Sequence, residues 1–386
     1  MGVRHACSRR NQLTSSIDDS RYYPIFSKMV RLYRLQYYPM TDICVLPDFS
    51  SEQATAIVER LYGLGGTLKI LNGERDLNYL LDTDNGRYVF KIANRDEPYG
   101  MLECQHQVLQ RLMSDNVLQQ QASSLRSVNG RVIEIITSES GINHYCRVLN
   151  YVEGDLLSSI YPQSTRLLYD LGKTLAQIDL SLQGYSHQAL DRPLLWNMCD
   201  ALTTLARFKP LLASDDRRNL IEYFEIYFRN SILPFSDNLR VGVIHNDAND
   251  NNVLVTLNPS SQQAIASIID FGDMVNSWIA AEPAIAAAYA MLGKDEPLDA
   301  AVAIIKGYHA QLPFNEAEVS VLFGFICMRL CMSVCICAHQ RSIEPENEYL
   351  SISELPAWAL LEKLKAISPD VAVDRFRETC EINSRG

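Results

Sequence analysis

Residues 243–273 contain Asp, Asn and His side chains at a spacing that suits phosphoryl transfer. An apolar run leads to His245 and Asp247, Asn252 follows Asp247 by five positions, and a second apolar run ends in Asp270. Transfer of a phosphoryl group needs one carboxylate to orient the attacking hydroxyl, and an Asn with a second Asp to hold Mg²⁺ on the nucleotide phosphates. We interpret Asp247 as the candidate catalytic base, and Asn252 and Asp270 as candidate metal ligands.

The neighbouring polar residues support this interpretation without deciding it. His245 precedes the candidate base by two positions, and Asp250 and Asp273 add two more carboxylates. An Asp in a turn after a strand is common, so Asp247 alone does not indicate a function. The combination of both runs favours phosphoryl-transfer machinery. Asp250 and Asp273 either contact a substrate amine or the metal, or bond to nearby backbone amides. The sequence leaves both alternatives open.

Lys91 is the candidate phosphate anchor. It lies in the apolar segment Tyr-Val-Phe-Lys-Ile, where a charge is costly unless it is paired or reaches an edge. A strand Lys that reaches the α- and β-phosphates, braced by a helix Glu, fits a kinase, and Glu103 on the following helix is the candidate brace. The alternative for Glu103 is a solvated residue favoured near a helix N-terminus.

The loop 72–76 occupies the place of a phosphate-binding flap. It contains one glycine, Gly73, which allows backbone amides to approach phosphate oxygens. Arg75 and Asp76 of the same loop are either part of the site or plain turn residues.

The pattern of apolar residues predicts two different halves. In the first half, a helix over 51–64 precedes three short strands joined by a loop and an Asn-Gly hairpin turn, and a second helix precedes two further strands. The strands are expected at 68–71, 77–82, 88–92, 132–136 and 145–151, and the second helix at 105–113. In the second half, helical periodicity dominates. Helices are expected at 166–182, 194–207, 217–232, 280–291, 298–311, 316–338 and 356–366.

These patterns predict an α+β fold with two lobes, since 386 residues exceed one comfortable core. We expect a basic extension at 1–40, a nucleotide-binding lobe with a small antiparallel sheet at 41–150, and a helical lobe at 151–386 that carries the catalytic and metal-binding loops. The extension holds seven Lys and Arg against two Asp and Glu.

The charge of the chain limits its partners. The net charge is −11, which argues against nucleic-acid binding. Residues 151–386 hold eighteen Lys and Arg against thirty Asp and Glu. This acidic half favours a cationic substrate, although acidity also serves solubility. The oligomeric state is not indicated.

Ten cysteines are scattered through the chain, and no secretory signal peptide precedes them, so reduced thiols in a cytoplasm are expected. Four of them lie at 327, 331, 335 and 337, where the spacing indicates buried helix positions rather than a metal site. The apolar run 319–338 has Arg329 at its centre, which favours a buried core helix over a membrane span.

The motifs Val-Ile-His245-Asn-Asp247-x₄-Asn252 and Ile-Ile-Asp270-Phe-Gly-Asp273 resemble those of the aminoglycoside phosphotransferase (choline kinase-like) superfamily. Segments such as Leu-Leu-Trp-Asn at 194–197 are similar to hydroxylysine kinase and its bacterial relatives, and the resemblance spans about residues 41–366. It implies a bilobal protein-kinase-like fold.

The resemblance also implies roles for individual residues. Asp247 would be the base, Asn252 and Asp270 the Mg²⁺ ligands, Lys91 and Glu103 the phosphate-anchoring pair, and His245 a support for the loop. The hinge that contacts the nucleotide base would include Asn150, Tyr151 and Val152. The chain departs from the family at two positions of the catalytic loop, which hold Asn246, where many relatives have Gly, and Ala248, where they often carry a larger residue.

We therefore expect a cytoplasmic kinase that uses Mg²⁺ and either ATP or GTP to phosphorylate the hydroxyl of an amino alcohol or hydroxy-amino acid. Two alternatives remain. One is a kinase for another acceptor, such as homoserine, choline, an aminoglycoside or a protein side chain. The other is a nucleotide-binding regulator of the pseudokinase type.

Overall fold

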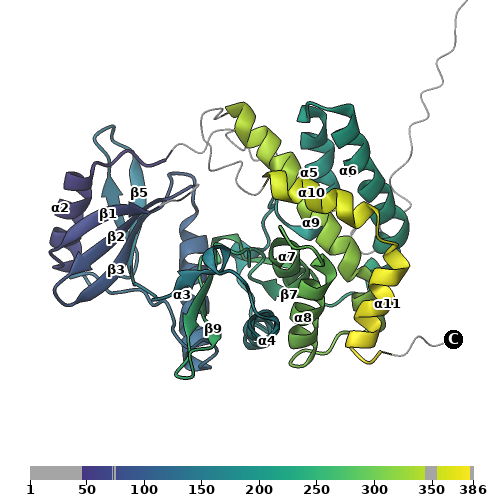
Figure 1. The fold of residues 1–386 in the computed structure, drawn as a ribbon. Helices are drawn as coiled ribbons and strands as arrows, with labels where there is room; N and C mark the ends of the chain where they lie inside the picture. Colours follow the sequence, from purple (N-terminus) through teal and green to yellow (C-terminus); the bar gives the residue numbers. More distant parts are fainter. Residues whose placement is uncertain (1–45, 72, 74, 344–353, 383–386) are drawn as a thin grey trace, which may run out of the picture. The chain divides into compact units, whose positions relative to one another are not determined.

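The computed structural model describes residues 46–71, 73, 75–343 and 354–382. The predicted extension 1–40 lies outside the described residues. Within them, the first part holds an antiparallel sheet and the later part is mostly helical (Figure 1). The predicted α+β class is therefore confirmed.

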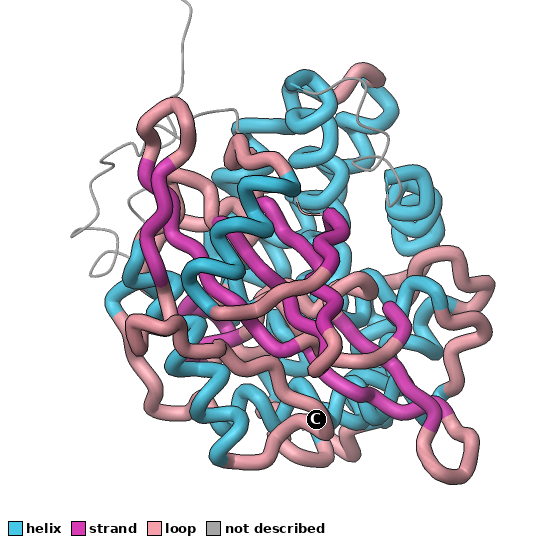
Figure 2. The backbone as a smooth tube through the Cα atoms, turned by 90° about the vertical axis from the view of Figure 1, so that its left-hand side faces the viewer, coloured by secondary structure: helices cyan, strands magenta, loops and turns pink. Residues whose placement is uncertain are grey.

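A five-stranded antiparallel sheet forms the first part, with the strand order β1-β2-β3-β5-β4 (magenta in Figure 2). Its strands are β1 (Thr67–Leu71), β2 (Leu77–Thr83), β3 (Gly86–Ile92), β4 (Glu134–Thr137) and β5 (Asn143–Asn150). Two helices accompany the sheet, α2 (Ser51–Tyr62) and α3 (Tyr99–Ser114). The predicted hairpin at Asn85-Gly86 is present, and Gly86 has a φ of +139° that suits its lack of a side chain.

One face of this sheet packs against α2 and forms a core. Phe90 and Ile92 of β3 are buried in this core together with Cys146 and Val148 of β5. Because side chains alternate along a strand, Lys91 and the residue opposite it on β5, Arg147, belong to the other face. The sheet thus places two cationic side chains next to each other, away from its own core.

The described residues of the helical part include five short strands, which form two small sheets. These are β7 (Val241–Ile244), β8 (Val253–Leu257), β9 (Gln263–Ile268) and β10 (Val275–Trp278), and a short β6 (Asp155–Leu156) pairs with β8. The described helices of this part are α4 (Thr165–Ser181), α5 (Ala201–Phe208), α6 (Asp215–Tyr227), α7 (Ala281–Ala290), α8 (Pro297–His309), α9 (Glu316–Ile343), α10 (Glu354–Lys365) and α11 (Pro369–Thr379).

Some helix predictions differ from the structure. The helix expected at 105–113 begins already at Tyr99, and the one expected at 217–232 is α-helical only to Tyr227. The helix expected at 194–207 begins only at Ala201, because Asn197 turns the chain before it: its Oδ1 accepts a hydrogen bond from the Cys199 amide at 3.1 Å. The helix α11 was not predicted. Only three of its residues are buried, Ala372, Val373 and Phe376, so its apolar stripe is too narrow to stand out in the sequence.

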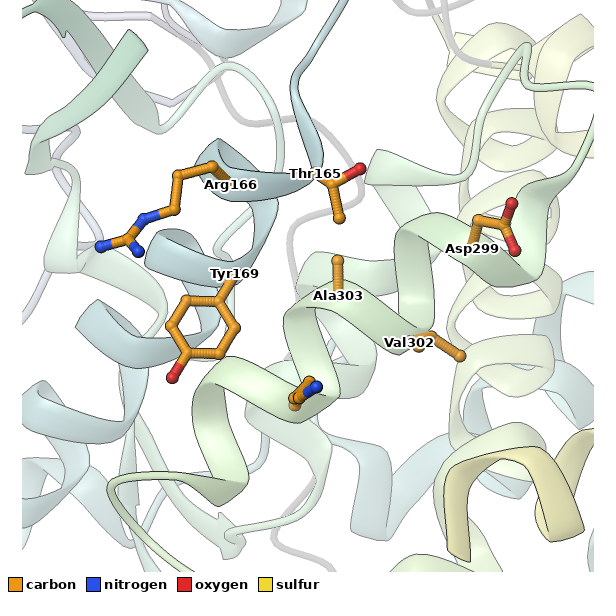
Figure 3. Close-up of a pocket in the computed structure, with 7 residues that line it drawn as sticks. Thr165, Arg166, Tyr169, Asp299, Val302 and Ala303 are labelled. Atoms are coloured by element: carbon orange, nitrogen blue, oxygen red, sulfur yellow. The ribbon is translucent and has the colours of Figure 1, made fainter. Parts of the chain in front are cut away.

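The helices α4 and α8 cross with their backbones in close approach. A Cβ on Gly172 would lie 1.9 Å from the Ile304 carbonyl oxygen, and one on Gly307 would lie 1.9 Å from the Tyr169 carbonyl oxygen. Both positions therefore require glycine. Beside this crossing lies a hollow of 540 Å³, lined by α4 residues such as Arg166 and Tyr169 and by the α8 segment 299–306 (Figure 3). It contains none of the candidate site residues.

The helix α9 is long and apolar enough, by length and composition, to cross a membrane. In the structure, 89% of its most apolar window is buried inside the protein. Cys327, Cys331 and Cys335 are free thiols buried on this helix, and Cys337 is buried on it as well. The prediction of a buried core helix is confirmed.

Candidate active site

Two loops, separated in the sequence by the β8–β9 hairpin, are flanked by the same two pairs of strands. The catalytic loop, residues 245–252, connects β7 to β8, and the metal loop, residues 269–274, connects β9 to β10. The last residue of β7, Ile244, pairs with Val275, which begins β10. The first residue of β8, Val253, pairs with Ile268, which ends β9. Both loops therefore lie side by side between the same two strand pairs, which explains why the two sequence motifs act together.

The Asp247 carboxylate is held by three side chains. Its Oδ1 accepts hydrogen bonds from Arg329 Nη2 at 2.8 Å and from Asn249 Nδ2 at 3.1 Å. Its Oδ2 accepts one from Asn252 Nδ2 at 2.8 Å. Burial raises the pKa of Asp247 to about 7, and the nearby Arg329 opposes this shift by favouring the charged form.

The Asn252 side chain is oriented by hydrogen bonds from its amide nitrogen, Nδ2, to Asp247. Its Nδ2 also donates to the Asp247 carbonyl oxygen at 2.9 Å, so the amide nitrogen is committed to the loop. Within the described residues, no hydrogen bond involves Asn252 Oδ1. An amide oxygen of this kind is a ligand that Mg²⁺ accepts.

The backbone of the catalytic loop is fixed by buried groups. His245 Nε2 lies 3.0 Å from the Ile269 carbonyl oxygen, which joins the catalytic loop to the metal loop. Asn246 has a φ of +66°, and its amide donates to Glu282 Oε2 on α7 at 2.9 Å. A left-handed backbone suits Gly, the residue that the family resemblance implies here, and Asn is among the few other residues that tolerate it. Burial raises the pKa of Glu282 to about 7.

Asp270 begins the metal loop in a left-handed conformation, with a φ of +60°. Its Oδ2 lies 3.6 Å from Lys91 Nζ, and its Oδ1 accepts a hydrogen bond from the Gly272 amide at 3.2 Å. The Lys91 ammonium holds the pKa of this carboxyl well below its usual range. Asp270 is therefore ionised and already faces a cation, so its carboxylate suits a metal ion.

Asn252 and Asp270 together fit the Mg²⁺ predicted for this site. The pairing of β8 with β9 brings the two residues to neighbouring positions, and the Ile269 amide donates to the Asn252 carbonyl oxygen at 2.9 Å. They offer one neutral and one charged oxygen, and water and phosphate oxygens supply the rest of a magnesium shell in kinases.

The structure does not show the predicted pairing of Lys91 with Glu103, and each residue has another partner. Glu103 lies on the outer side of α3, 46% exposed, and its Oε2 is 3.8 Å from His187 Nε2. The residues of α3 that face the sheet include Leu102 and Gln105, and 200° of helix rotation separates Gln105 from Glu103. In this structure Lys91 pairs with Asp270 instead.

The α3 residue that reaches a cation of the sheet is Gln105, and the cation is Arg147. Arg147 Nη2 donates a hydrogen bond to Gln105 Oε1, and Arg147 is buried beside Lys91 on the neighbouring strand. Burial lowers the pKa of this guanidinium, and the acidic groups of Asp76 and Asp270 oppose the shift. The back of the site is thus cationic, which suits polyphosphate.

Arg75 and Arg192 hold the metal loop from two sides. Arg75 Nη2 lies 2.5 Å from Asp273 Oδ1, and Arg192 Nη2 donates to the Gly272 carbonyl oxygen. Asp273 is therefore engaged by the loop 72–76, and of the two alternatives for Arg75 the structure favours a place in the site. Gly73 is exposed, and a Cβ there would come within 2.7 Å of the Asp76 carbonyl oxygen.

The predicted hinge connects β5 to β6. Asn150 uses its side chain internally, with Oδ1 accepting from Ser123 Oγ at 2.8 Å, and the Tyr151 amide donates to the Arg87 carbonyl oxygen at 3.0 Å. Among the described residues, the Val152 amide has no hydrogen-bond partner. Val152 is therefore the hinge residue best suited to meet a nucleotide base.

Asp250 stays without an assigned contact. Its carbonyl oxygen accepts from the Ser158 amide at 2.9 Å, and burial raises the pKa of its carboxyl. Neither observation decides between a substrate contact and a structural role, so both alternatives from the sequence remain.

The sequence interpretation did not identify several of the residues that position this site. Arg329, Glu282, Arg192, Arg147 and Gln105 contact it from elements far away in the sequence. Arg329 was noticeable in the sequence, because it is a charged residue at the centre of an apolar helix. The other four were not.

Comparison with known families identifies the chain. The model of the phosphotransferase enzyme family matches residues 67–321, which is more than half of the sequence and includes both loops. The chain belongs to this family. It is a phosphotransferase, as its loops indicate.

The most similar relatives include hydroxylysine kinases. The enzyme of Mus musculus is 27% identical over 358 residues, which cover 87% of this chain and 94% of that protein. The enzyme of Xenopus laevis is 28% identical over 356 residues, which cover 87% and 95%. The resemblance expected from the sequence motifs is confirmed.

Solved structures show the same fold. A microcompartment-associated aminopropanol kinase matches with a TM-score of 0.61 at 16% identity, over 86% of this chain and 95% of that one. Amicoumacin kinase, solved with AMP-PNP and Ca²⁺, matches with a TM-score of 0.61 at 13% identity, over 85% and 94%.

Proposed function

We propose that this protein is a small-molecule kinase that transfers the γ-phosphoryl group of ATP or GTP to the hydroxyl of a hydroxy-amino acid or amino alcohol, with 5-hydroxylysine as the first candidate. The observation that carries the proposal is the Asp247 carboxylate, fixed by Arg329, Asn249 and Asn252 beside an ionised Asp270. The hydroxylysine kinases among its relatives support the choice of acceptor.

In this mechanism Asp247 positions the acceptor hydroxyl and accepts its proton as the bond to phosphorus forms. Asn252 and Asp270 would hold Mg²⁺, which offsets the charge on the phosphates. Lys91 leaves Asp270 for the phosphates and steadies the departing diphosphate. Most of the rate enhancement comes from positioning and electrostatics.

A cationic acceptor is also part of the proposal. The catalytic loop carries Asp250 three positions after Asp247, and burial raises the pKa of its carboxyl. Asp250 is half-buried, and a carboxylate that has lost part of its water gains from a nearby cation. An ammonium group on the acceptor suits this position.

The test is a phosphoryl-transfer assay on the full-length protein with Mg²⁺ and labelled ATP or GTP. The acceptor panel contains 5-hydroxylysine, lysine, homoserine, choline, ethanolamine and 1-amino-2-propanol. We expect labelled product from 5-hydroxylysine and none from lysine, which lacks the hydroxyl, and EDTA should abolish transfer. Turnover of choline or homoserine in preference to 5-hydroxylysine would refute the acceptor. Nucleotide binding without turnover on any acceptor would refute the kinase.

A further inference from the structure

A buried guanidinium from the middle of α9 lies against the candidate base. Arg329 is 1% exposed, and its Nη2 donates to Asp247 Oδ1 at 2.8 Å. The helix α9 is otherwise apolar at its centre, with Met328 and Leu330 on either side. A charge in such surroundings is retained only where a partner compensates it.

The other nitrogens of Arg329 are fixed as well. Its Nε donates to the Tyr289 hydroxyl at 3.3 Å and its Nη1 to the Trp196 carbonyl oxygen at 3.3 Å. The Trp196 ring lies 4.3 Å from the guanidinium carbon, within the range of a cation–π contact. Three separate segments, around Trp196, on α7 and in the catalytic loop, therefore fix one planar group.

These contacts determine which hydrogen-bond acceptor positions of the Asp247 carboxylate are occupied. A carboxylate has about four acceptor positions, two on each oxygen. Arg329 and Asn249 occupy both positions on Oδ1, and Asn252 occupies one on Oδ2. Among the described residues no other group bonds to this oxygen, so one position on Oδ2 remains, where an acceptor hydroxyl can donate its hydrogen bond.

We propose that Arg329 is a positioning residue that fixes the rotation of the Asp247 carboxylate, so that this single acceptor position on Oδ2 faces the phosphoryl acceptor. The role rests on the proposed function of the site. Arg329 is too buried to touch a phosphate or the acceptor, so it acts through Asp247. A buried ion pair is weak evidence of stabilisation, because well-packed apolar residues often serve as well, and orientation accounts better for a guanidinium at this place.

The test compares Arg329→Lys and Arg329→Met with the wild type in steady-state kinetics. We expect kcat to fall about tenfold in the Lys variant and on the order of 10²-fold in the Met variant, because a misplaced reacting group costs about that much. The KM for the nucleotide should change less than about twofold, since nucleotide contacts are elsewhere. The Lys variant keeps a positive charge and the Met variant keeps only the packing. A smaller loss of kcat in the Lys variant therefore shows that the charge matters as well as the packing.

Two further variants guard against a loss of folding. Tyr289→Phe removes one hydrogen bond to Arg329 and leaves the ion pair, so kcat should fall only a few-fold. Arg240→Met is the control, because it breaks a different ion pair with a buried residue of α9. Its partner is Glu318, and this pair lies away from Asp247. The substitution should lower the melting temperature and leave kcat within about twofold of wild type. If Arg329→Lys keeps the wild-type kcat, the proposal is overturned.

A structural measurement separates this inference from the choice of acceptor. Wild-type protein without activity on 5-hydroxylysine would refute the acceptor and not the role of Arg329. Crystal structures of wild type and Arg329→Lys then decide that role. The Asp247 carboxylate should rotate in the variant and lose the Asn249 bond. A carboxylate that keeps the wild-type rotation without its arginine would overturn the proposal.

Discussion

The catalytic loop and the metal loop lie side by side, but they are held by different parts of the molecule. The catalytic loop is fixed from the helical part by Arg329 and Glu282, which are 1% and 0% exposed. The metal loop is held largely from the sheet part by Lys91 and Arg75, which are 13% and 42% exposed. The hydroxyl-orienting side of the site is thus built into the fold, whereas the phosphate side is held by cations that ligands can engage.

The two key carboxylates differ in the same way. Burial raises the pKa of Asp247 to about 7, whereas Lys91 holds the pKa of Asp270 well below its usual range. A base for a hydroxyl proton benefits from a raised affinity for protons, and a metal ligand has to stay ionised. The environments therefore fit the two roles that we propose for these carboxylates.

The largest expected effect is that of Asp247→Asn. The amide cannot accept the hydroxyl proton, so kcat should fall by about 10³-fold, within the range for general-base residues. Binding of Mg²⁺ and nucleotide should stay close to wild type in a thermal-shift titration. An equal kcat for variant and wild type would remove Asp247 from its role as base.

The next effect concerns the sheet side. Lys91→Met removes the cation beside Asp270 and should lower kcat/KM on the order of 10²-fold, the usual loss for one electrostatic contact in a transition state. In contrast to Asp247→Asn, nucleotide affinity should also fall, and isothermal titration calorimetry measures it directly. Unchanged affinity would mean that Lys91 does not reach the phosphates.

Two substitutions of Glu282 weaken the attachment of the catalytic loop to different degrees. Glu282→Ala leaves the buried Asn246 amide without its acceptor, which should cost about 1–3 kcal/mol of unfolding free energy and lower kcat about tenfold. Glu282→Gln retains an acceptor oxygen of similar shape and serves as the matched control. Urea unfolding and kinetics on both variants check this, and equal losses in the two would contradict the assigned hydrogen bond.

The smallest effects are expected at the exposed groups. Arg75→Gln removes the partner of Asp273 on the loop 72–76, and because the Arg75 side chain is 42% exposed, kcat/KM should change less than about fivefold. Glu103→Gln should change it less than about twofold, since Glu103 lies away from Lys91. A loss of 10²-fold in Glu103→Gln would show that α3 rotates to form the Lys91 pair during catalysis.

Much of this site could be predicted from the sequence because its residues lie in short local motifs. Asp247 and Asp270 closely follow apolar strands and Asn252 directly precedes one, and strand pairing then brings the motifs together. Lys91 stood out because it interrupts an apolar strand. The α+β class followed from the change of periodicity near residue 150.

The remaining features depend on tertiary packing that leaves no local trace. The choice between Glu103 and Gln105 depends on the rotation of α3 about its axis, and a Glu near a helix N-terminus was the more conspicuous residue. Arg329 lies 82 residues from Asp247, so no spacing connects the two. The α-helix α5 starts only after a short 3-10 turn at 198–200, which the Asn197 side chain caps, and a pattern of apolar residues does not reveal such a turn.

Hydrogen–deuterium exchange of the full-length protein with and without Mg²⁺ and a non-hydrolysable nucleotide tests most directly whether the two loops differ as described. The account predicts that the catalytic loop, 245–252, is already protected in the free protein and changes little. The metal loop, 269–274, and the segment 75–82 should gain protection when the nucleotide binds. Equal gains in both loops would contradict the claim that the hydroxyl-orienting side is built before the nucleotide arrives.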